Sequence, residues 1–174
     1  MRGLERTVRT GPKLRLSADT ILADALLSEL VAPGPVLWVV SAWISNVEVI
    51  DNTQGSFDDI LGDDHMTHYR LVDVLAKLAR SGTPVRVVTR PTTHNQLFVD
   101  QMKAIASDDA DLAVVFDPVE HEKTVCGRDW MISGSMNFTA SGIGANEESV
   151  RYVVDNVEVA QARIDFVARW GGIR

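Results

Sequence analysis

The residues with the clearest chemical potential lie in the last third of the chain. His121 and Lys123 are separated by one residue, and Gly134-Ser135-Met136-Asn137 begins thirteen residues after the histidine. Alternate side chains of a strand point to the same face, so a strand here would direct His121 and Lys123 the same way. A Gly-Ser-x-Asn turn beside them would add backbone N–H, hydroxyl and amide donors. Together these groups predict a phosphate-binding site.

Two further elements extend this pattern in chain order. Asp129 stands between the histidine and the Gly-Ser turn, and Asn146-Glu147-Glu148 follows the turn. The set resembles the signature of the phospholipase D superfamily, which is His-x-Lys, a downstream Asp, Gly-Ser-x-Asn and a later Asn-x-Glu. That family usually places its Asp seven residues after the histidine, where this chain has Arg128. We expect Asp129 to take a structural role near the site.

The resemblance implies a two-step reaction at phosphorus that needs no metal ion and no cofactor. His121 would be the nucleophile and would form a phosphohistidine that water then hydrolyses. Lys123 would hold the non-bridging phosphate oxygens, and Ser135 and Asn137 would donate hydrogen bonds to them. Glu148 would accept the proton on the other imidazole nitrogen of the histidine and fix its tautomer.

Four more residues are candidates for substrate contact. Gly134 and Thr139 belong to the Gly-Ser-x-Asn turn. His94 lies where a predicted strand leads into a helix, which is where open α/β sheets bind ligands. Trp43 ends a predicted strand and could stack on a base or an acyl chain. A structural role for His94, and a core or dimer-interface role for Trp43, are the alternatives.

The mechanism also needs a general acid for the leaving oxygen. In the family that the chain resembles, this acid is a histidine from a second copy of the motif, and the chain has one copy. The remaining histidines, His65, His68 and His94, are not followed by lysine at the required spacing. The resemblance therefore implies a two-fold homodimer in which the two His121 side chains meet at the interface.

Composition limits the possible partners and compartment. The 174 residues carry 17 basic and 24 acidic side chains, a net charge of -7, which disfavours binding nucleic acid by bulk electrostatics alone. Cys126 is the single cysteine, so no intrachain disulfide can form, and a reducing cytoplasm is expected. No apolar run reaches membrane-spanning length, so we expect no membrane insertion.

A metal site is conceivable around Asp63, Asp64, His65 and His68. These residues fall in a polar stretch and match no pattern with four clear donors, so a solvated loop is the preferred interpretation and no metal is expected. The whole polar stretch, residues 46–68, is longer than an ordinary connection. It is either a lid over the substrate or a disordered loop.

The order of predicted elements indicates an α/β fold. Helices are expected at residues 19–31, 69–80, 95–106 and 157–170, and strands at 36–43, 85–89, 112–116, 123–126, 130–133 and 149–154. The first strands alternate with helices, which favours parallel crossovers. We expect a mixed, largely parallel sheet with helices on both faces, in one domain at residues 17–174. The basic residues 1–16 would form a mobile arm.

The leading hypothesis is a phosphodiesterase that acts on DNA or RNA, since the small single-motif chain resembles small dimeric endonucleases and proteins of DNA modification or defence systems. Protein partners in such a system could supply specificity. One alternative is a phospholipase or phosphatidyl transferase, which would need an apolar rim around the site. Another is a non-catalytic nucleic-acid-binding component.

Overall fold

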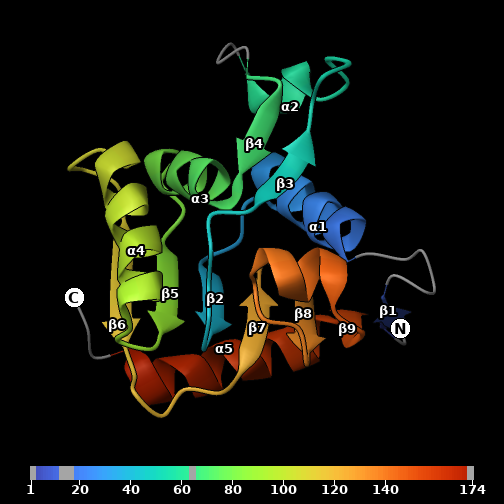
Figure 1. Cartoon of the computed structure of the whole chain (residues 1–174), viewed down its shortest axis with the longest axis vertical. Coiled ribbons are helices and arrows are strands. Elements are labelled where there is room, and N and C mark those ends of the chain that lie inside the picture. The colour runs from blue at the N-terminus through green and yellow to red at the C-terminus, as the bar shows by residue number, and fades with distance from the viewer. Residues whose placement is uncertain (1–2, 12–17, 63–65, 172–174) are drawn as a thin grey trace.

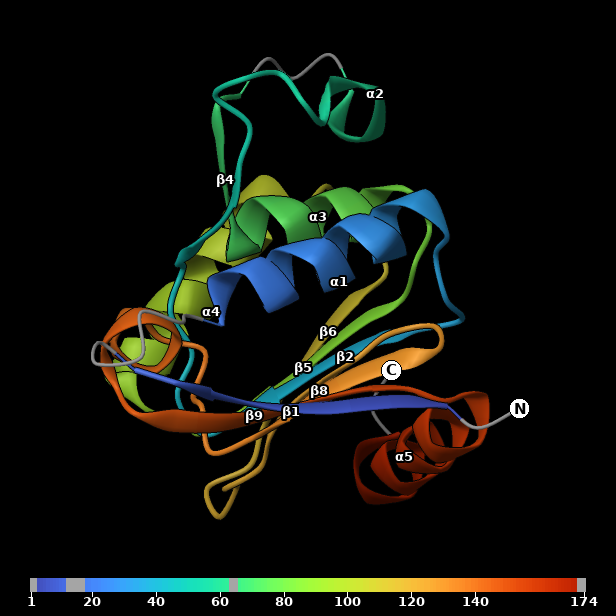
Figure 2. The same ribbon diagram turned by 90° about the vertical axis from the view of Figure 1, so that its right-hand side faces the viewer.

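The computed structural model describes residues 3–11, 18–62 and 66–171. Within these residues, a seven-stranded sheet in the order β1-β9-β8-β7-β2-β5-β6 forms the middle layer of the molecule (Figures 1 and 2). Its strands are β1 (Leu4–Thr10), β2 (Leu37–Ser41), β5 (Val85–Thr89), β6 (Leu112–Phe116), β7 (Lys123–Cys126), β8 (Trp130–Gly134) and β9 (Glu148–Val154).

Helices cover both faces of this sheet, as expected. One face carries α1 (Asp19–Val31), α3 (Leu71–Arg80) and α4 (Thr93–Ile105), and the other carries α5 (Asn156–Trp170). Figure 2 shows α1 and α3 on the opposite side of the sheet from α5.

The alternation of side chains in β2 explains how one strand serves both layers. Val39 belongs to the apolar cluster with Leu26 and Leu75 of the α1 and α3 layer. Its neighbours Trp38 and Val40 belong to the second cluster, with Phe166 of α5. All five residues of β2 are buried, which matches a continuous apolar sequence in a strand covered on both faces.

The sheet is mixed, but the expectation that it would be largely parallel is wrong. Among the described strands of this sheet, β2–β5 and β5–β6 are the parallel pairs, and the pairs β1–β9, β2–β7, β7–β8 and β8–β9 are antiparallel. The chain after β6 has no crossover helix until α5. The short segments from β6 to β7, β7 to β8 and β8 to β9 each stay at one end of the sheet, so each strand runs opposite to the one before it. Since β7 lies beside β2, the antiparallel half of the sheet begins with that pair.

The prediction of a mobile N-terminal arm is also wrong for the part of residues 1–16 that the structure describes. Leu4–Thr10 forms β1, an edge strand paired antiparallel with β9. Most of its side chains are exposed, so the sequence carries no alternating apolar signal for this strand. Its backbone pairing and the ion pair between Glu5 and Arg151 of β9, at 2.7 Å, hold it on the sheet. Residues 12–16 lie outside the described residues.

The polar stretch at residues 46–68 is folded where the structure describes it. It contains β3 (Glu48–Asp51), α2 (Asp58–Leu61) and β4 (His68–Arg70), and β3 pairs antiparallel with β4. The buried Asn52 side chain donates to Asp58 at 2.7 Å and accepts from the Phe57 N–H at 2.9 Å. This hairpin projects beyond the layer of α1 and α3 (Figures 1 and 2).

Candidate active site

Three antiparallel strands bring the motif residues to one edge of the sheet. Lys123 begins β7, Gly134 ends β8 and Glu148 begins β9. In the β7–β8 hairpin Thr124 lies opposite Ser133, so the start of one strand meets the end of the next. Ser41, the last residue of the parallel strand β2, pairs with Lys123. The C-terminal end of β2 therefore opens at the same edge.

His121 is exposed and stands just before β7, in a segment held by a buried carboxylate. Glu120 accepts the N–H of His121 at 2.8 Å and also the N–H of Glu122. Arg169 of α5 pairs with Glu120 at 3.2 Å and with Glu122 at 2.8 Å. Nothing in the sequence indicated this role for Glu120, because an acidic residue beside a histidine is usually exposed, whereas here its side chain is buried.

Arg90 reaches His121 from the end of β5. Its Nη2 atom lies 2.7 Å from both imidazole nitrogens, and its Nε donates to the Glu120 carbonyl at 2.6 Å. One atom equally close to both ring nitrogens cannot lie along either lone pair, so the guanidinium rests against the imidazole. Lys123 Nζ donates to the His121 carbonyl at 2.5 Å. Two cations therefore stand beside the histidine, as an anionic substrate requires.

Ser135 and Glu148 contact each other directly. The Ser135 hydroxyl donates to the Glu148 carboxylate and accepts the N–H of Ser149 at 3.0 Å. Asn146 Nδ2 donates to Glu148 at 3.3 Å. Among the described residues no hydrogen bond joins Glu148 to His121, so the expected bond between them is not formed here. Arg90 takes the position beside the imidazole instead.

Asn137 and Thr139 lie in the turn after β8. The Oδ1 atom of Asn137 is buried and has no hydrogen-bond partner among the described residues. Such an atom carries a desolvation cost. Thr139 shapes the turn: its N–H donates to the Asn137 carbonyl at 2.9 Å and its hydroxyl accepts from the Gly142 N–H at 3.2 Å.

Gly134 is required by the backbone. Its φ of 144° is one that other residues rarely adopt, and a Cβ there would lie 2.0 Å from the carbonyl oxygen of Ser149. The glycine lets the end of β8 approach β9 closely. That approach sets Ser135 beside Glu148.

Trp43 and His94 lie next to one another at the same edge. Their ring centroids are 6.0 Å apart in an edge-on arrangement, and His94 Nε2 lies 2.9 Å from Ser45 Oγ. The buried Asn95 side chain holds these loops together. It accepts the Ile44 N–H at 3.1 Å and donates to the carbonyls of Ala42 at 2.9 Å and Arg90 at 3.0 Å. Sequence reasoning did not single out Asn95, since an asparagine near a helix start usually forms only a local cap.

Asp129 is not beside the histidine. It lies in the turn between β7 and β8, at the opposite end of the hairpin from Lys123. Its carbonyl accepts the N–H of Asp155, which precedes α5. The one-residue displacement from the usual position therefore falls in a turn far from the motif residues.

The described residues contain no group of three or more histidine, cysteine or acidic side chains placed to hold a metal ion. His68 pairs with Glu48 at 2.9 Å on the β3–β4 hairpin. His65, Asp63 and Asp64 lie outside the described residues. In the described part of the chain no helix is both long and apolar enough to cross a membrane.

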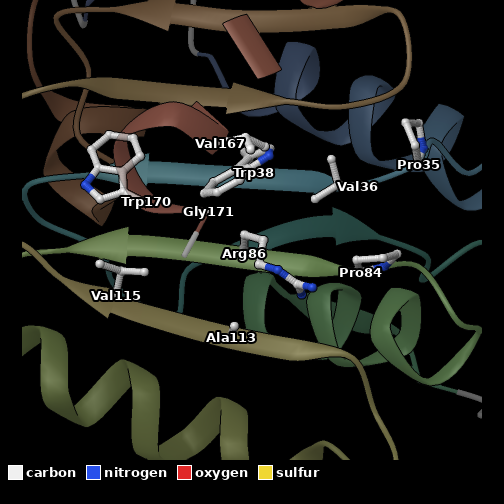
Figure 3. Close-up of a pocket in the computed structure, with 10 residues that line it drawn as sticks. All are labelled: Pro35, Val36, Trp38, Pro84, Arg86, Ala113, Val115, Val167, Trp170 and Gly171. Atoms are coloured by element: carbon white, nitrogen blue, oxygen red, sulfur yellow. The ribbon is translucent and has the colours of Figure 1, made fainter. Parts of the chain in front are cut away.

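A pocket on the face covered by α5 is separate from this site (Figure 3). Its lining includes Trp38, Arg86, Val167 and Trp170. Pro35 and Pro84, which also line it, precede β2 and β5, so the pocket lies toward the N-terminal ends of these strands. The motif residues lie at the C-terminal ends.

Comparison with known proteins agrees with this geometry. Residues 47–170 match the family described as "Cardiolipin synthase, PLD-like domain". No curated protein matches the sequence.

Solved structures share the fold over nearly the whole chain. NucT from Helicobacter pylori is 11% identical with a TM-score of 0.66, and 99% of this chain and 98% of NucT are covered. Nuc from Salmonella typhimurium, a phospholipase D family member, is 14% identical with a TM-score of 0.62, and the match covers 99% of this chain and 97% of Nuc. Polyphosphate kinase from Porphyromonas gingivalis is 11% identical with a TM-score of 0.64, covering 96% of this chain and 24% of the kinase.

Because these sequence identities are only 11% to 14%, the structural likeness shows a shared fold and nothing about activity. The family match is independent of it and extends over well more than half of the 174 residues. It includes the motif residues from His121 to Glu148. The chain therefore belongs to the phospholipase D-like domain family.

Proposed function

We propose that this protein is a metal-independent phosphodiesterase that cleaves DNA or RNA through a phosphohistidine intermediate. The observation that carries the proposal is the gathering of His121, Lys123, Ser135 and Asn137 at one edge of the sheet, with Arg90 against the histidine. Membership of the phospholipase D-like family and the fold shared with Nuc support it.

In the first step a nitrogen of His121 attacks phosphorus while the bond from phosphorus to the leaving oxygen breaks. Lys123 and Arg90 hold the non-bridging oxygens and stabilise the charge that develops on them. Ser135 and Asn137 add hydrogen bonds. In the second step water attacks phosphorus and the P–N bond breaks, so one phosphodiester and one water yield a phosphomonoester and an alcohol.

Glu148 is proposed to orient the imidazole of His121 during this reaction. That role requires the ring to move away from Arg90 and toward the carboxylate. A substrate phosphate would favour this movement, because the arginine would then pair with the phosphate instead of the histidine. Gly134 and Thr139 would shape the turn that surrounds the phosphate.

The leaving oxygen needs a proton, which we assign to His121 of a second copy of the chain. The motif occurs once in the sequence, and a two-fold axis beside the exposed His121 would bring two copies of the ring together. A cytoplasmic homodimer, assisted by protein partners of a DNA modification or defence system, completes the proposal.

Two rivals remain to be tested. A phosphatidyl transferase would need an apolar rim, and the exposed Trp43 is the one large apolar side chain that the structure shows among the site residues named above. A non-catalytic nucleic-acid-binding component would not need an intact nucleophile, yet His121, Lys123 and Asn137 are all present.

The deciding experiment measures cleavage of bis-p-nitrophenyl phosphate, single- and double-stranded DNA, and RNA in excess chelator. We expect the wild type to cleave and His121→Ala to lose at least about a thousandfold in rate. His68→Ala is the matched control, because His68 pairs with Glu48 on the distant hairpin. If the wild type cleaves none of these substrates, the binding role replaces the enzymatic one.

A further inference from the structure

We infer that Trp43, supported by His94, is a stacking platform for an unpaired nucleobase next to the scissile phosphate, so the substrate is single-stranded nucleic acid. The inference rests on the proposed function of the neighbouring phosphate site and specifies its substrate class. It is carried by the position, exposure and rigid support of the indole ring.

Backbone contacts place Trp43 between the phosphate-binding residues. Ser41 is paired with Lys123, and Trp43 follows two residues later. Ile44 forms a parallel bridge with Phe138, and the Ser45 N–H donates to the Phe138 carbonyl at 2.8 Å. The segment carrying the indole therefore has Lys123 at one end and the Asn137 turn at the other.

The exposure of Trp43 sets it apart from the other tryptophans. Its side chain is 40% exposed, whereas Trp38, Trp130 and Trp170 are exposed by 3%, 2% and 7%. Trp38 and Trp170 pack with Phe166 in the core under α5, and the Trp130 indole donates to the buried Glu29 at 2.9 Å. The other three tryptophans are thus accounted for by packing or hydrogen bonding.

The support of the ring is rigid. His94 meets the indole edge-on and is bonded to Ser45, and Asn95 fixes the backbone on both sides of Trp43 through Ala42 and Ile44. A ring already held in place loses little conformational entropy when a ligand stacks on it. Stacking on aromatic side chains is the usual way in which proteins bind unpaired bases of any sequence.

The charges beside the platform suit the same ligand. Arg90 and Lys123 supply cations at the site although the chain has a net charge of -7. A base on Trp43 and its phosphate between the cations would use both features at once. In a duplex both faces of a base are already stacked, so the platform selects an unpaired base.

Two p-nitrophenyl phosphodiesters test the inference by turnover: thymidine 5′-(p-nitrophenyl phosphate), which carries a base, and methyl p-nitrophenyl phosphate, which does not. Stacking contributes about 1–3 kcal/mol per base, so Trp43→Ala should lower kcat/KM for the thymidine ester by about 5- to 150-fold. The methyl ester should change by less than about twofold. Trp43→Phe should retain most of the activity, and Ile164→Ala, an exposed apolar residue of α5, should match the wild type. Equal losses on both esters, or none on either, would overturn the inference.

A binding measurement separates this inference from the proposed function. Tryptophan fluorescence of the His121→Ala protein should be quenched by oligothymidylate, and the quenching should disappear when Trp43→Phe is added. If oligothymidylate quenches the fluorescence but the wild type cleaves no substrate, the catalytic proposal is refuted and the stacking platform is supported. Absence of quenching, or quenching by phosphatidylglycerol vesicles alone, would refute the platform whatever the activity. Ribose and deoxyribose oligomers then show which sugar binds more tightly.

Discussion

At the scale of single residues, the most informative contact joins Arg90 to His121. The guanidinium rests against the imidazole ring, and no hydrogen bond joins the ring to Glu148 among the described residues, so Arg90 holds the proposed nucleophile away from its expected partner. A phosphate would compete for the arginine and release the ring. Substrate binding and activation of the nucleophile would then be one event.

Cys126 gives a residue-scale prediction about pH. Burial raises the pKa of its thiol from 9.0 to about 12. The neutral thiol is the favoured form in the fold, so its contribution to stability is complete below about pH 9 and is lost as the pH rises from 9 toward 12. A disulfide reagent such as DTNB, applied at pH 8.5, should label Cys126 in urea but not in buffer. Rapid labelling of the folded protein would contradict the burial of the thiol.

Among the helices and strands, α5 holds the segment that carries His121, the proposed nucleophile. Arg169 joins the last turn of this helix to Glu120 and Glu122, and its guanidinium lies 3.9 Å from the ring centroid of Trp170. Asp117, at the start of the same segment, accepts the Trp170 indole N–H at 3.1 Å. The C-terminal helix therefore sets the position of His121 although it contributes no residue to the site.

Arg169→Ala tests this connection. Removing the arginine leaves the buried Glu120 carboxylate without its charged partner, so we expect a loss of about 2 kcal/mol in the free energy of unfolding. Urea denaturation measures it. Turnover should also fall, because His121 would lose its fixed position. Arg80→Ala, at an exposed residue that ends α3, is the control and should change stability by less than about 0.5 kcal/mol. If Arg169→Ala and Arg80→Ala lowered stability and turnover equally, Arg169 would not be the residue that positions His121.

For the molecule as a whole, the proposed two-fold dimer predicts both a mass in solution and a result for mixed subunits. Light scattering after size-exclusion chromatography should give twice the chain mass of 19.1 kDa. If both copies of His121 serve one site, co-refolding equal amounts of wild type and His121→Ala should leave about a quarter of the wild-type activity, because mixed dimers are inactive. Independent sites would leave about half. Co-refolding with His68→Ala should leave the activity unchanged.

The sequence pattern predicted the elements well wherever burial was periodic or continuous. The helix expected at 19–31 is Asp19–Val31, and the strands expected at 85–89 and 112–116 have the bounds observed. The pattern failed for β1, whose side chains are mostly exposed, and for the β3–β4 hairpin, whose polar residues make local hydrogen bonds. Backbone pairing at a sheet edge leaves no hydrophobic signature to read.

The motif from His121 to Glu148 and the α/β class can be read from the sequence alone, because residue type, order and spacing are local properties. Three features depend on the folded chain: most strand pairs are antiparallel, Arg90 and not Glu148 contacts His121, and Asn95 fixes the Trp43 loop. Each of these depends on which segments, far apart in the chain, lie side by side. The Arg90–His121 contact across 31 positions and the Asn95–Ala42 hydrogen bond across 53 positions follow from the packing of the whole core and from no short stretch of residues.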